Sequence, residues 1–186
     1  MTRLPASLVV LFSASLALAA CANSTSSIHG SRHTLYTGVT ELAADSEAVV
    51  DVIVESQEIV QEDTPYTLST VTIITPLQPK GLAANQLGPA TVAPTERLVI
   101  RQLGSSEEEE VSAPLLEVGG RYLLFITSTK MEGDAASQFY ITDVSAGIYS
   151  TENSSNARGG EVSYVQVDAD SGDTLPSTLT ATELTG

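Results

Sequence analysis

Apolar and polar residues alternate along residues 48–60 (AVVDVIVESQEIV). In an extended chain, Val50, Val52 and Val54 lie on one face and Asp51 lies on the other. Alternation with a period of two is typical of a β-strand with one face buried and one face in water. The sequence therefore predicts a strand here, with Asp51 on its solvent side.

β-Branched and aromatic residues mark the other expected strands. Residues 66–75 (YTLSTVTIIT) follow the turn sequence Glu-Asp-Thr-Pro, and we expect them to form a hairpin with the first strand. Residues 115–127 (LLEVGGRYLLFIT) contain a Gly-Gly turn and then a run that is apolar on both faces, which indicates a central, fully buried strand. Further strands are expected at 96–103, 138–144, 147–149 and 162–167.

One short helix is expected before the first strand. Thr40 is a candidate N-cap, and the residues that follow it, up to Ser46, supply an acidic first turn and an alanine-rich interior. A single helix among many strands predicts a fold that is mainly all-β. The 186 residues have room for one domain with a sizeable core.

The first 20 residues have the build of a secretory signal peptide, with Arg3 as the positive start and an apolar run at 8–18 that is too short to span a bilayer. The residues that end this segment, Leu18-Ala19-Ala20-Cys21, closely resemble the lipobox of bacterial lipoproteins. The resemblance implies cleavage before Cys21 and attachment of acyl chains such as palmitate to its thiol. Such a protein is anchored to the bacterial cell membrane, facing outside the cytoplasm, without crossing it. The alternative is an ordinary signal peptide with an unrelated cysteine.

Composition narrows the chemistry that is available to the chain. Cys21 is the only cysteine, so its lipidation would leave no disulfide, no cysteine nucleophile and no thiolate metal ligand. The net charge is −15, and removal of residues 1–20 takes Arg3 away and leaves 23 acids against 7 bases. A surface of this kind repels nucleic acid and anionic lipid headgroups and favours cationic partners. We therefore expect no nucleic-acid partner.

Polar segments flank and interrupt the expected domain. Residues 21–38 are small and polar, which predicts a flexible tether between the lipid and a domain at 39–168, and residues 169–186 are expected to form a polar tail. Two surface segments are candidates for function. They are the proline-containing loop from Pro76 to Pro94 and the acidic run from Glu107 to Glu110, whose simplest explanation is a solvated loop tip.

Several short motifs together resemble a family of small secreted bacterial β-domains. They are the strand with Val50 and Val52, its hairpin partner, the segment Ile100-Arg101-Gln102-Leu103-Gly104 and the segment 116–125 (LEVGGRYLLF). Their order is also similar to that of netrin-like and tissue-inhibitor-of-metalloproteinase domains, which are OB-type β-barrels. The resemblance implies a small antiparallel OB-like barrel and brings no catalytic residue with it. In the metalloproteinase inhibitors a free N-terminal cysteine reaches the zinc of the target, whereas Cys21 would be lipidated and lies far from the first strand.

Candidate chemical sites are few. Asp168, Asp170 and Asp173 alternate beside a glycine as at the start of a calcium loop, but Leu179 stands where such a loop has its bidentate glutamate. We therefore prefer an ordinary turn and keep the three residues as weak calcium candidates. Both histidines lie in the expected tether, and no G-x-S-x-G or S-x-x-K motif is present. The sequence predicts no catalytic residue and no cofactor.

These observations predict a membrane-anchored lipoprotein of the cell envelope whose barrel is a non-catalytic binding module for an envelope protein, peptide or glycan. Two alternatives from other classes stay open. One is a hydrolase that uses surface carboxylates, which would need a concave pocket holding an acid pair with shifted titration. The other is a passive envelope protein without a specific ligand.

Overall fold

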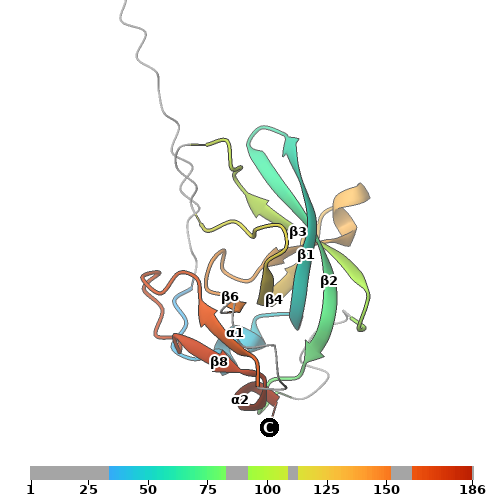
Figure 1. Ribbon diagram of the computed structural model, residues 1–186. Coiled ribbons are helices and arrows are strands. Elements are labelled where there is room, and N and C mark those ends of the chain that lie inside the picture. The colour runs from blue at the N-terminus through green and yellow to red at the C-terminus, as the bar shows by residue number, and fades with distance from the viewer. Residues whose placement is uncertain (1–33, 83–91, 109–112, 152–160, 186) are drawn as a thin grey trace, which may run out of the picture.

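The computed structural model describes residues 34–82, 92–108, 113–151 and 161–185. Its strands are β1 (Ala48–Gln61), β2 (Pro65–Leu77), β3 (Arg97–Leu103), β4 (Arg121–Ser128), β5 (Gln138–Ile141), β6 (Ile148–Thr151), β7 (Ser163–Gln166) and β8 (Thr178–Thr180). Its helical elements are α1 (Val39–Ala44), the 3₁₀ turn η1 (Gly133–Ser137) and α2 (Ala181–Thr185). Figure 1 shows the long β1–β2 hairpin rising above the remaining strands, with α1, β8 and α2 gathered at the opposite end.

Five strands close into a barrel in the order β1-β2-β3-β5-β4, and β4 pairs back onto β1. The pairings are antiparallel except for β3–β5, which is parallel. A five-stranded barrel of this kind is the OB-type architecture, so the expected OB-like fold is confirmed. The parallel pair was not part of the sequence prediction, because a contact of two residue pairs between distant segments leaves no periodic signal.

The barrel interior is filled by one apolar cluster, to which Val50, Val52 and Val54 each contribute a side chain that is at most 2% exposed. These are the positions that the period-two pattern placed on the buried face. The other buried members are Ala48, Val71, Ile73, Leu98, Ile100, Leu116, Tyr122, Leu124, Ile126, Ile141 and Ile148.

A second apolar cluster lies on the outer face of β1 and β4, beneath α1, β6, β7, β8 and α2. β4 therefore contributes Leu124 and Ile126 to the barrel interior and Leu123 and Phe125 to this second cluster, all with no exposed surface. The expectation that this segment is the central, fully buried strand is confirmed. The remaining buried members are Tyr36, Leu42, Ala43, Val49, Leu77, Ala146, Tyr149, Tyr164, Leu179 and Leu184.

Asp51 does not face solvent, and the prediction from the alternating pattern is wrong at this position. The second cluster covers the outer face of β1 at its first half, so the Asp51 side chain is only 3% exposed. Arg121 compensates its charge: Nε donates to Asp51 Oδ1 over 2.9 Å, and the other guanidinium nitrogen Nη2 donates to Oδ2. A second layer of structure over a strand cannot be seen in the strand's own sequence.

The C-terminal residues are not a loose tail. Within the segment predicted as a tail, β8 pairs with β7, and Leu179 and Leu184 are 5% and 3% exposed in the second cluster. The carbonyl of Leu184 also accepts a hydrogen bond from the backbone N–H of Lys80 over 2.6 Å. The polar, threonine-rich composition of this segment predicted a tail, but its two leucines pack into the second cluster and complete the outer layer.

Three predicted boundaries also differ from the structure. The expected tether extends into the fold at Tyr36, which is 3% exposed and donates its backbone N–H to Asp173 Oδ1 over 2.7 Å. The helix α1 begins after Gly38, not after Thr40, and Glu41 instead accepts hydrogen bonds from Thr37. The second strand continues through Pro76, which pairs with Val50, so the proline-containing loop begins later than predicted.

Candidate functional site

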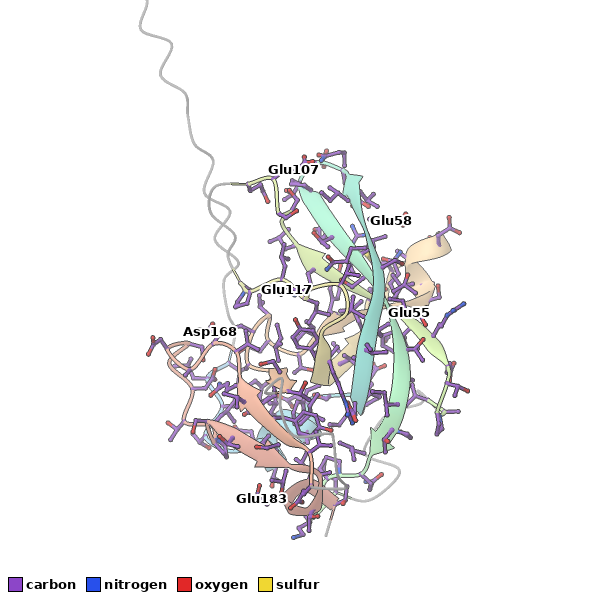
Figure 2. All side chains as sticks on the ribbon, viewed as in Figure 1. Glu55, Glu58, Glu107, Glu117, Asp168 and Glu183 are labelled. Carbon is purple, nitrogen blue, oxygen red and sulfur yellow. The ribbon has the colours of Figure 1, made fainter. Side chains whose placement is uncertain are left out.

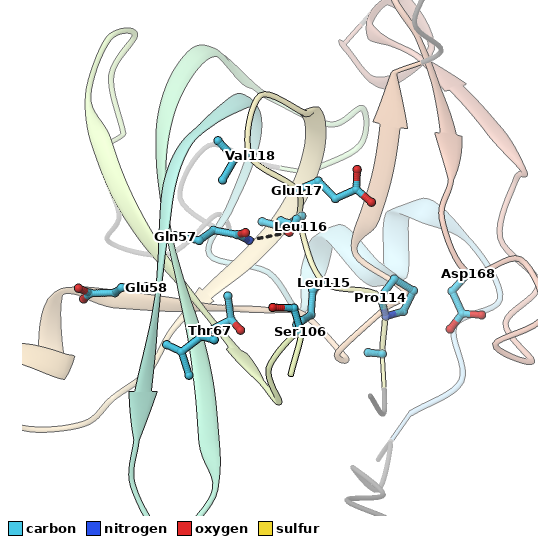
Figure 3. A pocket seen from close by; sticks show the side chains of 12 residues that line it. Gln57, Glu58, Thr67, Ser106, Pro114, Leu115, Leu116, Glu117, Val118 and Asp168 are labelled. Carbon is cyan, nitrogen blue, oxygen red and sulfur yellow. Dashed lines mark hydrogen bonds between the residues drawn. The ribbon is translucent and has the colours of Figure 1, made fainter. Parts of the chain in front are cut away.

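A groove of about 1150 Å³ lies between the outer half of β1 and the loop at 113–118 (Figure 3). Its floor comes from the β1–β2 hairpin, and the loop at 113–118 and Asp168, two residues after the end of β7, form the facing wall. The lining residues are Gln57, Glu58, Ile59, Thr67, Ser106, Ala113, Pro114, Leu115, Leu116, Glu117, Val118 and Asp168.

The groove exists because β1 is longer than the strand that flanks it. Pairing of β1 with β4 ends at Ile53 opposite Arg121, whereas pairing with β2 continues to Gln61. Two backbone hydrogen bonds extend the pairing with β4 by one residue of β1: Val54 N–H donates to the Gly120 carbonyl, and Gly119 N–H donates to the Val54 carbonyl. Beyond this point the chain of β4 turns away, and the hairpin projects past the barrel.

Polar side chains fix the loop that forms the facing wall. Gln102 reaches it from β3: its Nε2 donates to the Pro114 carbonyl, and its Oε1 accepts from Leu116 N–H, both over 3.0 Å. Gln57 of β1 donates from Nε2 to the Leu116 carbonyl over 2.6 Å, which joins the hairpin directly to the wall (Figure 3). Since Gln102 is 7% exposed and Leu116 is 2% exposed, the wall is anchored in the barrel core.

The end of this wall is held by the Gly-Gly pair before β4. Gly119 has a φ of 82°, a conformation that strongly favours glycine. A Cβ at Gly120 would lie 2.5 Å from the Tyr122 ring and 2.9 Å from the Glu117 carbonyl. The lack of a side chain at Gly120 lets the Tyr122 ring pack against the backbone there, where its hydroxyl accepts a hydrogen bond from the backbone N–H of Glu117 over 3.1 Å.

The groove combines apolar and acidic surface. Ile59 on the floor is 37% exposed and Val118 on the wall is 59% exposed. Among the described lining residues, three are acidic and none is basic. Glu117 and Asp168 lie on the side of the groove opposite β1, whereas the Glu58 carboxylate points to the far side of the hairpin (Figure 3).

The described bases are mostly engaged elsewhere. Arg97, Arg101 and Arg121 form ion pairs with Glu55, Glu62 and Asp51, and Lys130 lies 4.0 Å from Glu47. Figure 2 shows the labelled carboxylates spread from Glu107 near the hairpin tip to Glu183 at α2. The electrostatic character of the groove is therefore negative, in keeping with the net charge of −15.

A second, smaller cavity of about 450 Å³ lies around Arg101, with Tyr36, Tyr66 and Tyr140 in its lining. The guanidinium is 3% exposed, donates to Glu62 over 2.6 Å and to Gln138 over 3.3 Å, and stacks 3.8 Å above the Tyr66 ring. Burial lowers the pKa of Arg101, but the hydrogen bond and charge of Glu62 outweigh it and the net shift is upward. Arg101 thus joins the hairpin end to β5.

The structure does not bring the predicted site residues together in one site. Cys21 lies outside the described residues. Asp168 and Asp173 belong to a turn, in which Ser171 N–H donates to the Asp168 carbonyl and Ser171 Oγ donates to Asp173. In the ranges that the structure describes, no three His, Cys, Asp or Glu side chains gather as a metal site would require. Asp168 nonetheless lines the groove, a position that no sequence pattern predicts.

Of the two predicted functional segments, the described part of the acidic run directly follows a residue that lines the groove. Ser106 lines it, Glu107 follows, and Glu108 turns back to accept the backbone N–H of Ser105 over 2.8 Å. Glu109 and Glu110 lie outside the described residues, as do residues 83–91 of the proline-containing loop. The described ends of that loop, at 76–82 and 92–94, line neither cavity.

Comparison with known proteins finds no matching family model, no matching curated protein and no matching solved structure. The resemblance to the lipobox and to netrin-like domains therefore stays a prediction from the residues that carry it. None of the helices in the described ranges is long and apolar enough to cross a membrane.

The groove residues were not predicted from the sequence. One signal for them was present: the pattern for the first strand covers 13 residues, whereas the apolar run after the Gly-Gly turn, Tyr122 to Ile126, covers 5. A strand that is much longer than its neighbour projects beyond it, and the projecting part is free on one side.

Proposed function

We propose that the protein is a lipid-anchored binding module of the bacterial cell envelope and that the groove beside β1 receives its ligand. The groove carries this proposal, because it is concave, has exposed apolar side chains at Ile59 and Val118, and has a wall that is fixed to the barrel core. Grooves that combine apolar contact with a few placed polar groups are the usual form of a recognition site. The anchor is Cys21, through the lipobox resemblance.

The acids with a shifted pKa give no support to the alternative of carboxylate catalysis, because the shifts favour the ionised form. Glu41, Glu55 and Glu161 have a lowered pKa, each because a threonine donates a hydrogen bond to the carboxylate. A carboxylate stabilised in its ionised form is a poor general acid. None of the three lines the groove.

Site-specific photo-crosslinking in intact cells tests the proposal. A photoreactive residue is placed at Ile59 or Val118, and in a matched control at Ile74, a β2 isoleucine of similar exposure (38%) that does not line the groove. We expect one discrete adduct from the two groove positions and not from Ile74. A Cys21→Ala variant should form the same adduct at lower yield, because it is not held at the membrane.

The passive alternative predicts a different result. If Ile59, Val118 and Ile74 crosslink to the same broad set of abundant envelope proteins, the groove has no specific ligand and the proposal fails. Equal yield from the Cys21→Ala variant would instead contradict the role of the anchor.

A further inference from the structure

The outer half of β1 is an unpaired strand edge. Residues 56–61 pair with β2 on one side, and on the other side no backbone hydrogen bond joins them to any part of the chain that the structure describes. The corresponding residues of β2, Tyr66 to Thr70, pair with both β1 and β3. The free row of N–H and C=O groups borders the groove, because Gln57, Glu58 and Ile59 belong to both.

This edge lacks the lysine and proline residues with which many proteins block exposed strands. Natural edges are blocked by lysine, proline or inward-pointing charge, by a bulge, or by a covering loop. In β1 a register shift occurs between Val54 and Ser56, and residues 56–61 (SQEIVQ) beyond it hold one charge, no lysine and no proline. The wall at 113–118 faces this segment across the groove and bonds to it through the Gln57 side chain. An added strand would therefore find unpaired backbone on one side and apolar surface from Ile59 and Val118 beside it.

The negative charge of the groove determines which class of ligand it favours. The side of the groove opposite β1 carries Glu117 and Asp168, and none of the described lining residues is basic, so a peptide with Lys or Arg is attracted and an acidic one is repelled. A second copy of this chain would bring a further charge of −15 to the same surface, which disfavours self-pairing. A glycan would leave the backbone donors and acceptors of β1 without strand partners.

We propose that an extended, cationic segment of a partner protein binds by adding a strand to the free edge of β1. In this mode the backbone hydrogen bonds provide affinity, and the groove side chains select the sequence. Six residues of edge span about 20 Å, enough for a peptide of about the same number of residues. The inference rests on the proposed function and specifies the partner of that same groove.

The test uses three synthetic peptides and the full chain. The first alternates lysine and valine, the second alternates glutamate and valine, and the third is the lysine peptide with N-methyl groups on alternate residues, which removes the donors of one edge. We expect the lysine peptide to bind at least about tenfold more tightly than either of the others. Its binding should also slow amide hydrogen exchange at residues 56–61. Ile59→Lys should weaken binding, and the matched variant Ile74→Lys should not.

Each contrary outcome overturns a stated part of the inference. Equal binding of the N-methylated peptide, or unchanged exchange at 56–61, excludes strand addition, and equal binding of the glutamate peptide excludes the role of charge. Self-association of the chain in place of peptide binding would assign the edge to a second copy. If the crosslinked partner at Ile59 is captured in cells but the lysine peptide does not compete with it, the inference fails and the binding function stands. If no partner is captured, both fail.

Discussion

Asp51 and Arg121 form an ion pair whose two ends differ in exposure, and we expect them to respond differently to mutation. The Asp51 side chain is 3% exposed and the Arg121 side chain is 22% exposed. The hydrogen bond to Asp51 raises the pKa of the Arg121 guanidinium, and burial opposes it. Asp51 lies beneath the outer layer, whereas Arg121 at the start of β4 can turn toward water.

The magnitudes follow from what each mutation leaves behind. Arg121→Leu leaves a buried carboxylate without its cation, which costs about 3–5 kcal/mol in the free energy of unfolding. Asp51→Asn keeps the shape and one acceptor oxygen, and the partly exposed guanidinium regains hydration. The loss is then that of one charge-assisted pair, about 1–3 kcal/mol. We expect the two variants to differ by about 2 kcal/mol, with Arg121→Leu the less stable.

Urea unfolding at neutral pH, followed by far-ultraviolet circular dichroism, measures both losses. The double variant is the control for additivity, since removal of both charges leaves no uncompensated ion. Its loss should be smaller than the sum of the two single losses. Equal losses in the single variants, or a double variant that shows simple additivity, would refute the argument from unequal burial.

Three further results are expected. Leu184→Ala should lower the free energy of unfolding by about 2–5 kcal/mol, because the side chain is 3% exposed in the outer cluster; a loose tail would give no change. Gly120→Ala should destabilise by about 1–3 kcal/mol through its contact with the Tyr122 ring, whereas Gly38→Ser adds a Cβ with no neighbour within 4 Å and should be neutral or slightly stabilising. Burial raises the pKa of Tyr149 and of Tyr164 above the ordinary value of 10.0, so the folded state holds these protons more tightly than the unfolded chain. Their contribution to the free energy of unfolding is therefore complete below about pH 10 and is lost as the pH rises further. Tyrosinate absorbance from these two residues should appear together with loss of the circular dichroism signal. Its appearance while the protein is still fully folded would contradict the burial argument.

The elements that sequence predicted well are those whose signal is local. The period of two in β1, the β-branched run in β2 and the two-sided apolar run in β4 each predict a strand without knowledge of its neighbours, and in β1 and β4 the apolar positions of the pattern are buried in the structure. Errors arose where a distant segment decided the outcome. Asp51 is buried because a layer that includes Tyr164 and Leu179 covers it, and these two residues are more than 100 positions away in the sequence.

The groove was missed for a related reason. Gln57, Glu58 and Ile59 read as a continuation of an ordinary strand, and only the end of the β4 pairing at Arg121 leaves one side of them free. The loop that completes the site, at 113–118, has no periodicity of its own. Its position depends on Gln102 of β3, whose side chain contacts the loop only in the folded barrel.

The motifs on which the predicted resemblance rests have structural roles, and these same roles shape the groove. In the segment at 100–104, Arg101 fixes the end of the hairpin through its ion pair with Glu62, and Gln102 holds the facing wall through hydrogen bonds. In the segment that precedes β4, Gly120 and Tyr122 fix the other end of that wall. A chain could therefore keep these motifs, and with them the groove, while the exposed residues at Ile59 and Val118 change with the ligand. Because the backbone of the β1 edge is independent of those side chains, strand addition would persist across such changes, and the groove side chains and their charges would set which segment is added.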